Sequence, residues 1–148
     1  MPRYGVVDLA SAVGLRSVVT ELRPPDGAPL LDPEEFADLL PVGPWIVDLG
    51  RAQDVYAAWM EAGRWKNWGW IFDSGADLET LRHHFRKFNL VEVEGSDAPF
   101  LFRYFDPVVL GDCLGSVFDS GQKQAFLHGI DRLYLEDAET EQVYVHPL

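Results

Sequence analysis

The stretch that decides the fold class is Phe102-Arg103-Tyr104-Phe105-Asp106-Pro107-Val108-Val109-Leu110. Phe102 and Tyr104 alternate with Arg103, which is the period of a β-strand with one buried face. Asp106 before Pro107 is typical of a helix start, because the carboxylate accepts hydrogen bonds from free N–H groups and proline fits the first helical position. The stretch therefore predicts a strand that leads into a capped helix.

Outward from this junction, apolar runs and helical periods alternate along the chain. The expected strands cover residues 4–9, 45–49, 68–72, 90–94, 100–104, 133–135 and 143–145. The expected helices cover residues 11–22, 52–62, 77–88 and 122–128, with two more starting at Asp32 and Asp106. This order predicts an α/β or α+β fold, a mixed sheet flanked by helices, and a C-terminal hairpin over 131–148.

Four of the predicted helices rest on specific residues. The helix over 77–88 has one apolar face, formed by Leu78, Leu81, Phe85 and Phe88. The helix over 11–22 would bury Val13, Val18 and Leu22. Asp32-Pro33-Glu34-Glu35 repeats the capped start, and Leu110, Leu114, Val117 and Phe118 form the apolar stripe after Asp106.

Length, charge and cysteine content exclude several classes of protein. A chain of 148 residues suits a single domain, here 1–148, and a net charge of −12 disfavours nucleic acids and anionic membranes as partners. The only cysteine, Cys113, excludes an internal disulfide and a cysteine-based zinc site. No apolar run approaches the ~20 residues of a membrane span, and the N-terminus lacks the apolar core of a signal peptide. We therefore expect a protein of a reducing cytoplasm; its oligomeric state is left open.

The middle of the chain differs from the rest in charge and in tryptophan content. Six basic and five acidic residues lie between Arg51 and Lys87, so this window carries +1 and the remainder −13. Trp45, Trp59 and Trp70 are expected in the core. Tryptophan and arginine are enriched at binding hot spots, so the candidate partner-binding residues are Arg64, Trp65, Lys66, Trp68, Arg82 and Arg86, together with Arg103.

Catalytic and metal-binding patterns are not recognised in the sequence. His83 and His84 are adjacent and point about 100° apart on a helix, so they do not share one metal ion. Asp8, Asp48 and Asp73 follow predicted strands, where capping of the next turn is favoured over catalysis. We expect no enzyme activity, no cofactor and no metal; the alternative is a small acid–base enzyme that uses His84 with one of these three carboxylates.

The junction at 102–110 resembles the FRxxDPxxL hallmark of the type VI secretion effector adaptors, also called effector chaperones. Further stretches are similar to family motifs in the same order, namely Tyr4-Gly5-Val6-Val7-Asp8-Leu9-Ala10, Gly43-Pro44-Trp45-Ile46-Val47-Asp48-Leu49, Trp68-Gly69-Trp70-Ile71-Phe72-Asp73-Ser74, and Leu78 and Leu81 with His84-Phe85-Arg86. The resemblance covers residues 4–127 and marks Asp8, Phe102, Arg103, Tyr104, Asp106, Pro107 and Leu110 as motif residues. Val108 stands where the family usually has arginine.

The resemblance implies a non-enzymatic adaptor that binds a toxic effector and helps load it onto the secretion spike, the valine-glycine-repeat protein or its PAAR tip (VgrG/PAAR). Arg103 is expected to pair with Asp8 or Asp106, and the motif either fixes the fold or contacts a partner. A second alternative is an immunity-like inhibitor, because an acidic protein suits a basic toxin.

Overall fold

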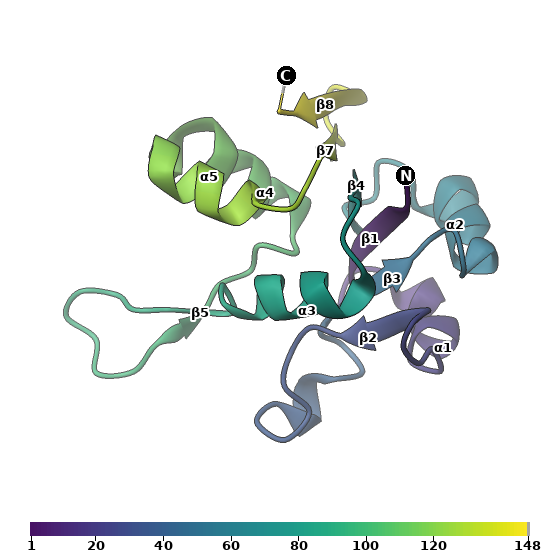
Figure 1. Ribbon diagram of the computed structural model, residues 1–148, viewed down its shortest axis with the longest axis horizontal. Helices are drawn as coiled ribbons and strands as arrows, with labels where there is room; N and C mark the ends of the chain where they lie inside the picture. Colours follow the sequence, from purple (N-terminus) through teal and green to yellow (C-terminus); the bar gives the residue numbers. More distant parts are fainter. Residues whose placement is uncertain (148) are drawn as a thin grey trace.

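A six-stranded antiparallel sheet with the strand order β2-β3-β1-β4-β7-β8 lies at the centre of the protein (Figure 1). In that order the strands are Gly27–Pro29, Pro44–Asp48, Arg3–Asp8, Gly69–Asp73, Arg132–Asp137 and Gln142–His146. This computed structural model describes residues 1–147. Each strand pairing in that part of the chain is antiparallel, where a mixed sheet was expected. Strand periodicity does not specify strand direction, which depends on the path of each connection.

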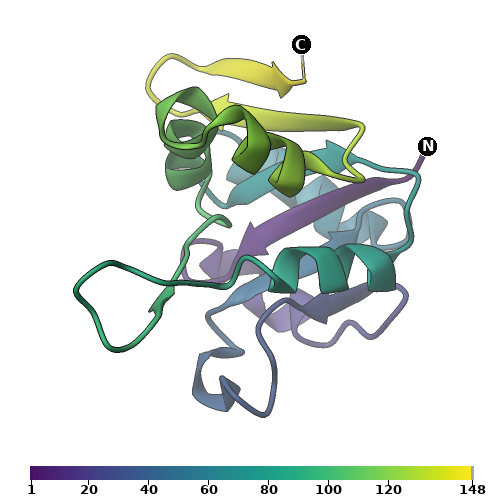
Figure 2. The ribbon, with the colours of Figure 1, turned by 60° about the vertical axis from the view of Figure 1, so that its left-hand side comes forward.

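Helices cover both faces of the sheet (Figure 2), and because the sheet is antiparallel the domain is of the α+β class. The α-helices are α1 (Arg16–Val19), α2 (Gln53–Ala58), α3 (Leu78–Arg86), α4 (Pro107–Asp112) and α5 (Ser120–Leu127). Helices α2 and α4 continue into π-helical turns at Trp59–Gly63 and Cys113–Val117. Helices α3, α4 and α5 pack on one face, and α1 and α2 on the other. No helix within residues 1–147 has the length and apolar character needed to cross a membrane.

Two apolar cores lie on opposite faces of the sheet, because successive side chains of a strand alternate between its faces. In β1, Tyr4 and Val6 join the larger core under α3, α4 and α5, whereas Val7 joins the smaller core under α1 and α2. The predicted core positions of Trp45, Trp59 and Trp70 are confirmed, since all three side chains are buried.

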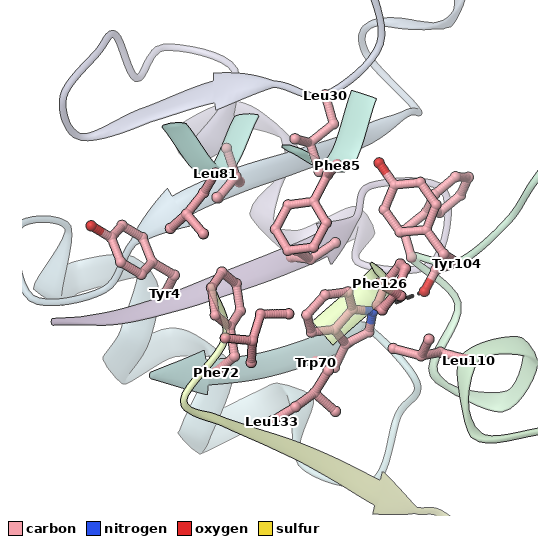
Figure 3. Packing of buried hydrophobic residues seen from close by; sticks show 14 of the residues in the cluster. Tyr4, Leu30, Trp70, Phe72, Leu81, Phe85, Tyr104, Leu110, Phe126 and Leu133 are labelled. Atoms are coloured by element: carbon pink, nitrogen blue, oxygen red, sulfur yellow. Dashed lines mark hydrogen bonds between the residues drawn. The ribbon is translucent and has the colours of Figure 1, made fainter. Parts of the chain in front are cut away.

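The larger core is rich in aromatic rings (Figure 3). The ring centroid of Trp70 lies 5.5 Å from that of Phe72 and 5.6 Å from that of Phe85. The Trp70 indole Nε1 donates a hydrogen bond of 2.9 Å to the carbonyl oxygen of Tyr104. This bond joins the central strand β4 to the segment that precedes α4, and it satisfies a donor that would otherwise be buried without a partner.

Two predicted helices are largely absent. The segment 11–22 forms only a 3₁₀ turn at Val13–Leu15 and the four-residue α1, and the expected apolar residues Val13 and Val18 are 59% and 40% exposed. Leu15 and Val19 are buried instead. Gly14 weakens a helix here, and the tighter 3₁₀ turn changes which side chains face the sheet.

The capped start at Asp32 also does not lead into an α-helix. The Asp32 carboxylate accepts a hydrogen bond of 2.9 Å from the Glu34 N–H, but only a 3₁₀ turn at Ala37–Leu39 follows. Residues 33–39 contribute no buried side chain. A short helix without a buried apolar face lacks the tertiary contacts that most protein helices need.

Apart from the hairpin over 90–104, the remaining predicted elements are confirmed. Helix α3 begins after Asp77, whose carboxylate accepts from the Thr80 N–H at 2.8 Å, and it buries Leu78, Leu81 and Phe85. Strands β7 and β8 form the expected C-terminal hairpin. Helix α5 begins two residues earlier than expected, because Asp119 and Gln122 form a reciprocal capping box.

Strands β5 (Leu90–Val91) and β6 (Phe100–Leu101) form a separate two-stranded sheet. Residues 90–101, here called the arm, project away from the rest of the domain (Figure 1). The predicted hairpin is thus present, but its paired part is shorter than expected.

Candidate functional site

The motif residue Asp106 caps α4 as predicted. Its carboxylate accepts a hydrogen bond of 2.9 Å from the Val108 N–H, and its carbonyl oxygen accepts from the Leu110 N–H at 3.0 Å. Pro107 occupies the first turn of α4 and is buried, as is Leu110. These residues hold the start of the helix against the larger core, which gives the motif a structural role.

Arg103 contacts both of its predicted partners. Its guanidinium Nη2 lies 3.6 Å from Oδ2 of Asp8 and 3.8 Å from Oδ2 of Asp106. Asp8 ends β1 and its side chain is 1% exposed, whereas that of Arg103 is 55% exposed. The Asp8–Arg103–Asp106 network therefore connects the end of β1 to the start of α4, and one side of the arginine faces solvent.

Burial raises the pKa of the Asp8 carboxyl, because desolvation disfavours its charged form. The hydrogen bond from the Ala10 N–H and the positive charge of Arg103 oppose this shift. Asp8 also caps the turn after β1 as predicted, and it accepts a weak hydrogen bond from the Ser11 hydroxyl at 3.4 Å.

The prediction that Phe102 and Tyr104 lie on a strand is wrong, since β6 ends at Leu101. The Phe102 N–H bonds to the carbonyl oxygen of Asn89, and the Tyr104 carbonyl accepts from the Trp70 indole. Tyr104 is fully buried, and its hydroxyl donates to Oδ1 of Asn89 at 2.8 Å. The Phe102–Asn89 bond continues the register of β5 and β6, and the chain leaves this ladder afterwards, where Tyr104 bonds to Trp70 and to the Asn89 side chain.

The loop 64–68 lies beside the Asp8–Arg103–Asp106 network, because the Asp8 N–H donates to the Trp68 carbonyl oxygen at 2.7 Å. The guanidinium carbon of Arg64 lies 4.6 Å from the centroid of the Trp65 ring, a cation–π geometry, and Arg64 also pairs with Glu136. Trp65 has a φ of 65°, which is uncommon for a bulky residue. Lys66 is exposed and Trp65 is half-buried.

The Trp68 side chain packs against the interior of the protein, whereas a residue that only binds a partner would be exposed. A Cβ atom on Gly63 would lie 2.3 Å from Cε3 of Trp68, so the indole rests directly on the glycine backbone. Trp68 also packs against the smaller core. We therefore assign Trp68 mainly to the packing of the loop 64–68.

Arg82 and Arg86 lie on α3, which packs against the larger core, whereas Trp68 of the loop 64–68 packs against the smaller core on the other face of the sheet. Arg82 pairs with Glu79 on the same helix. The Nε and Nη2 atoms of Arg86 are buried and have no hydrogen-bond partner among the described residues. The structure thus divides the predicted set into a group around Asp8 and a separate pair on α3.

The histidine and aspartates of the enzyme alternative lie in different environments. His84 is buried, and its Nε2 lies 2.7 Å from the carbonyl oxygen of Phe126; burial lowers the pKa of its imidazole. Asp48 accepts from the Gly50 N–H as a cap at 3.0 Å. Asp73 does not cap a turn as expected: it pairs with Arg3 at 2.8 Å, and this bond lowers the pKa of its carboxyl.

Cys113 is buried, and burial raises the pKa of its thiol. A thiol in such a setting is a poor nucleophile. Within residues 1–147 no cluster of three or more His, Cys, Asp or Glu side chains is arranged around a common metal position.

The model of one protein family matches residues 3–125 and carries the description "Domain of unknown function (DUF4123)". The chain belongs to this family. DUF4123 is the family of the type VI secretion effector adaptors, so the resemblance inferred from the 102–110 junction is confirmed. No curated protein and no solved structure matched the chain.

The DUF4123 match spans β1 through nearly all of α5 and leaves β7 and β8 outside. It therefore contains the Asp8–Arg103–Asp106 network, the loop 64–68 and the arm. The arm was expected only as a hairpin, and its exposure was missed as a functional signal. The alternating sequence Val91-Glu92-Val93-Glu94 is the signal that could have indicated this exposure. The apolar side chains of an alternating strand stay in water where no other element packs on them.

Proposed function

We propose that this DUF4123 protein is a non-enzymatic adaptor that binds a type VI secretion effector in the bacterial cytoplasm and helps load it onto the spike, VgrG/PAAR. The observation that carries this proposal is the family match over residues 3–125. An adaptor acts through contacts, so its function depends on exposed aromatic, apolar and charged side chains.

We place one partner-binding surface at the loop 64–68 and the adjoining Arg103. Lys66 is exposed, Trp65 is half-exposed, and the Arg103 side chain is 55% exposed. The Arg64–Trp65 stack holds an aromatic ring and a cation together, and such residues are enriched at hot spots. Arg82 and Arg86 on α3 would form a second, separate contact.

The test is co-expression with the effector and the spike protein encoded beside this chain, followed by gel filtration. We expect a stable complex with the effector. Trp65→Ala with Lys66→Ala is expected to weaken the complex by about 30-fold, as for a hot spot of about 2 kcal/mol. Trp68 is left unchanged because its removal would disturb packing.

The matched control removes one exposed aromatic ring and one exposed cation elsewhere, through Tyr144→Ala with Arg132→Ala. Full affinity of the Trp65/Lys66 variant would move the contact surface away from the loop 64–68. If the wild type binds neither neighbouring protein, the adaptor function is wrong.

The same proposal states that the protein works without a metal or cofactor. Purified protein is expected to contain no stoichiometric zinc, iron or nucleotide by elemental analysis and mass spectrometry. A stoichiometric ion lost on His84→Gln would favour the enzyme alternative.

A further inference from the structure

The arm, residues 90–101, is the most exposed segment of the domain. Every residue from Leu90 to Phe100 is exposed, and the paired residues of the two strands are Leu90–Leu101 and Val91–Phe100. Figure 2 shows the arm extending away from the sheet and the helices. A two-stranded ribbon alone is marginally stable in water. The outer edges of β5 and β6 have no strand partner within residues 1–147.

Large apolar side chains are concentrated on this arm. Four of the exposed large hydrophobic residues lie within it, namely Leu90, Val91, Val93 and Phe100. Phe100 is 53% exposed and Val93 is 44% exposed. Clustered exposed apolar side chains on a soluble domain mark interaction surfaces.

The base of the arm is held firmly, although its tip is not. Asn89 is buried directly before β5; its Nδ2 donates to the Leu30 carbonyl oxygen at 2.8 Å, and its Oδ1 accepts from the Tyr104 hydroxyl. The Asn89 carbonyl oxygen also accepts from the Phe102 N–H at 2.8 Å. These bonds orient the arm relative to the core, and a pre-oriented element loses less entropy on binding.

The charge of the arm selects among possible occupants. It contains Glu92, Glu94 and Asp97 and no basic residue. Anionic lipid would repel these carboxylates, and so would a second copy of a chain whose net charge is −12. A protein surface with an apolar centre and basic residues around it complements both properties of the arm.

We propose that the arm docks into an apolar, basic-rimmed surface of the effector, separately from the contact at the loop 64–68. This inference rests on the adaptor function proposed above. The exposed valines and Phe100 enter the apolar centre, and Glu92 and Glu94 pair with the basic rim.

The test measures the affinity of the neighbouring effector for full-length arm variants by isothermal titration calorimetry. Val93→Ser with Phe100→Ser is expected to weaken binding at least about 30-fold. Glu92→Lys with Glu94→Lys is expected to weaken it at least about 10-fold at low salt. A further variant replaces residues 92–99 by Asn-Gly, which closes β5 and β6 with a two-residue turn and removes the tip.

The controls make the same chemical changes at exposed sites outside the arm. Val13→Ser with Val117→Ser matches the apolar loss, and Glu34→Lys with Glu35→Lys matches the charge change. These variants are expected to bind as the wild type does. Unchanged thermal unfolding of the arm variants would show that only a surface has been altered.

Each outcome decides between the two proposals. Binding by the wild type with no loss in any arm variant overturns the docking role and leaves the adaptor function standing. No binding by the wild type overturns both. Sedimentation with phosphatidylserine vesicles that the Val93/Phe100 variant abolishes would assign the arm to a lipid surface and overturn the protein partner.

Discussion

Asp106 stabilises the start of α4 through one side-chain hydrogen bond to the Val108 N–H. Asp106→Ala removes this cap and one of the two carboxylates near Arg103, so we expect a loss of about 1 kcal/mol in the free energy of unfolding, measured by urea denaturation. Asp112→Ala, on the same helix but exposed, is the matched control and should change the free energy by less than about 0.5 kcal/mol. Equal effects of both changes would contradict a capping role.

The shifted pKa of the Asp8 carboxyl predicts how the stability of the protein depends on pH. Its folded-state pKa lies above the ordinary value of 3.8 because of burial, so the folded protein keeps the proton at pH values where the unfolded chain has lost it. The stability of the wild type relative to Asp8→Asn is therefore expected to rise as pH falls from 7 to 4. Urea denaturation at intervals of one pH unit measures this difference.

Asp73 is the control, because its pKa is shifted in the opposite direction to that of Asp8. Its pKa is lowered, first by the hydrogen bond from Arg3, so its contribution to stability is present above about pH 4 and is lost as pH falls below that value. Asp73→Asn should thus approach wild-type stability in acid. If the wild type became more stable relative to both Asp8→Asn and Asp73→Asn as the pH falls, the lowered pKa assigned to Asp73 would be wrong.

At the scale of elements, two glycines in helical turns have opposite surroundings. A Cβ atom at Gly63 would lie 2.3 Å from the Trp68 ring, whereas one at Gly111 on α4 would have no atom within 4 Å. Gly63→Ala must displace Trp68, and we expect it to destabilise the domain by about 1–3 kcal/mol. Gly111→Ala should stabilise it by about 0.5–1 kcal/mol, because alanine loses less backbone entropy in a helix. Thermal and urea unfolding of the pair checks both signs.

At the scale of the whole molecule, the net charge of −12 acts on association more than on folding. If the effector presents a basic surface, the association rate constant should fall at least about 10-fold between 50 mM and 500 mM salt, while the dissociation rate constant changes less. Surface plasmon resonance separates the two rates. An association rate independent of salt would contradict electrostatic steering toward the effector.

The sequence alone predicted the elements that depend on neighbouring residues. The cap of α4 at Asp106 involves a hydrogen bond that spans two residues, so residue type and spacing suffice to predict it. The buried strands β1, β3 and β4 follow from short apolar runs in the same way. The family also follows from local motifs, since its hallmark lies within nine consecutive residues.

The candidate site could be predicted only in part. The pairing of Arg103 with Asp8 and Asp106 was expected from the motif, and the structure has both contacts. The division of the basic residues between the loop 64–68 and α3 was not predictable, because it depends on how separate elements pack. The exposure of the arm was missed for the same reason.

Tertiary contacts determined where the elements expected from the local sequence end, and which of them form. The strand expected over 100–104 ends at Leu101, because Trp70, 34 residues away, takes the Tyr104 carbonyl oxygen as a hydrogen-bond acceptor. The helix expected after Asp32 does not form, because no part of the core covers its side chains. The antiparallel strand order likewise depends on connections across the whole chain. Local hydrogen bonds and periodicity specify which elements can form, whereas burial against distant residues determines which of them persist and how they are arranged.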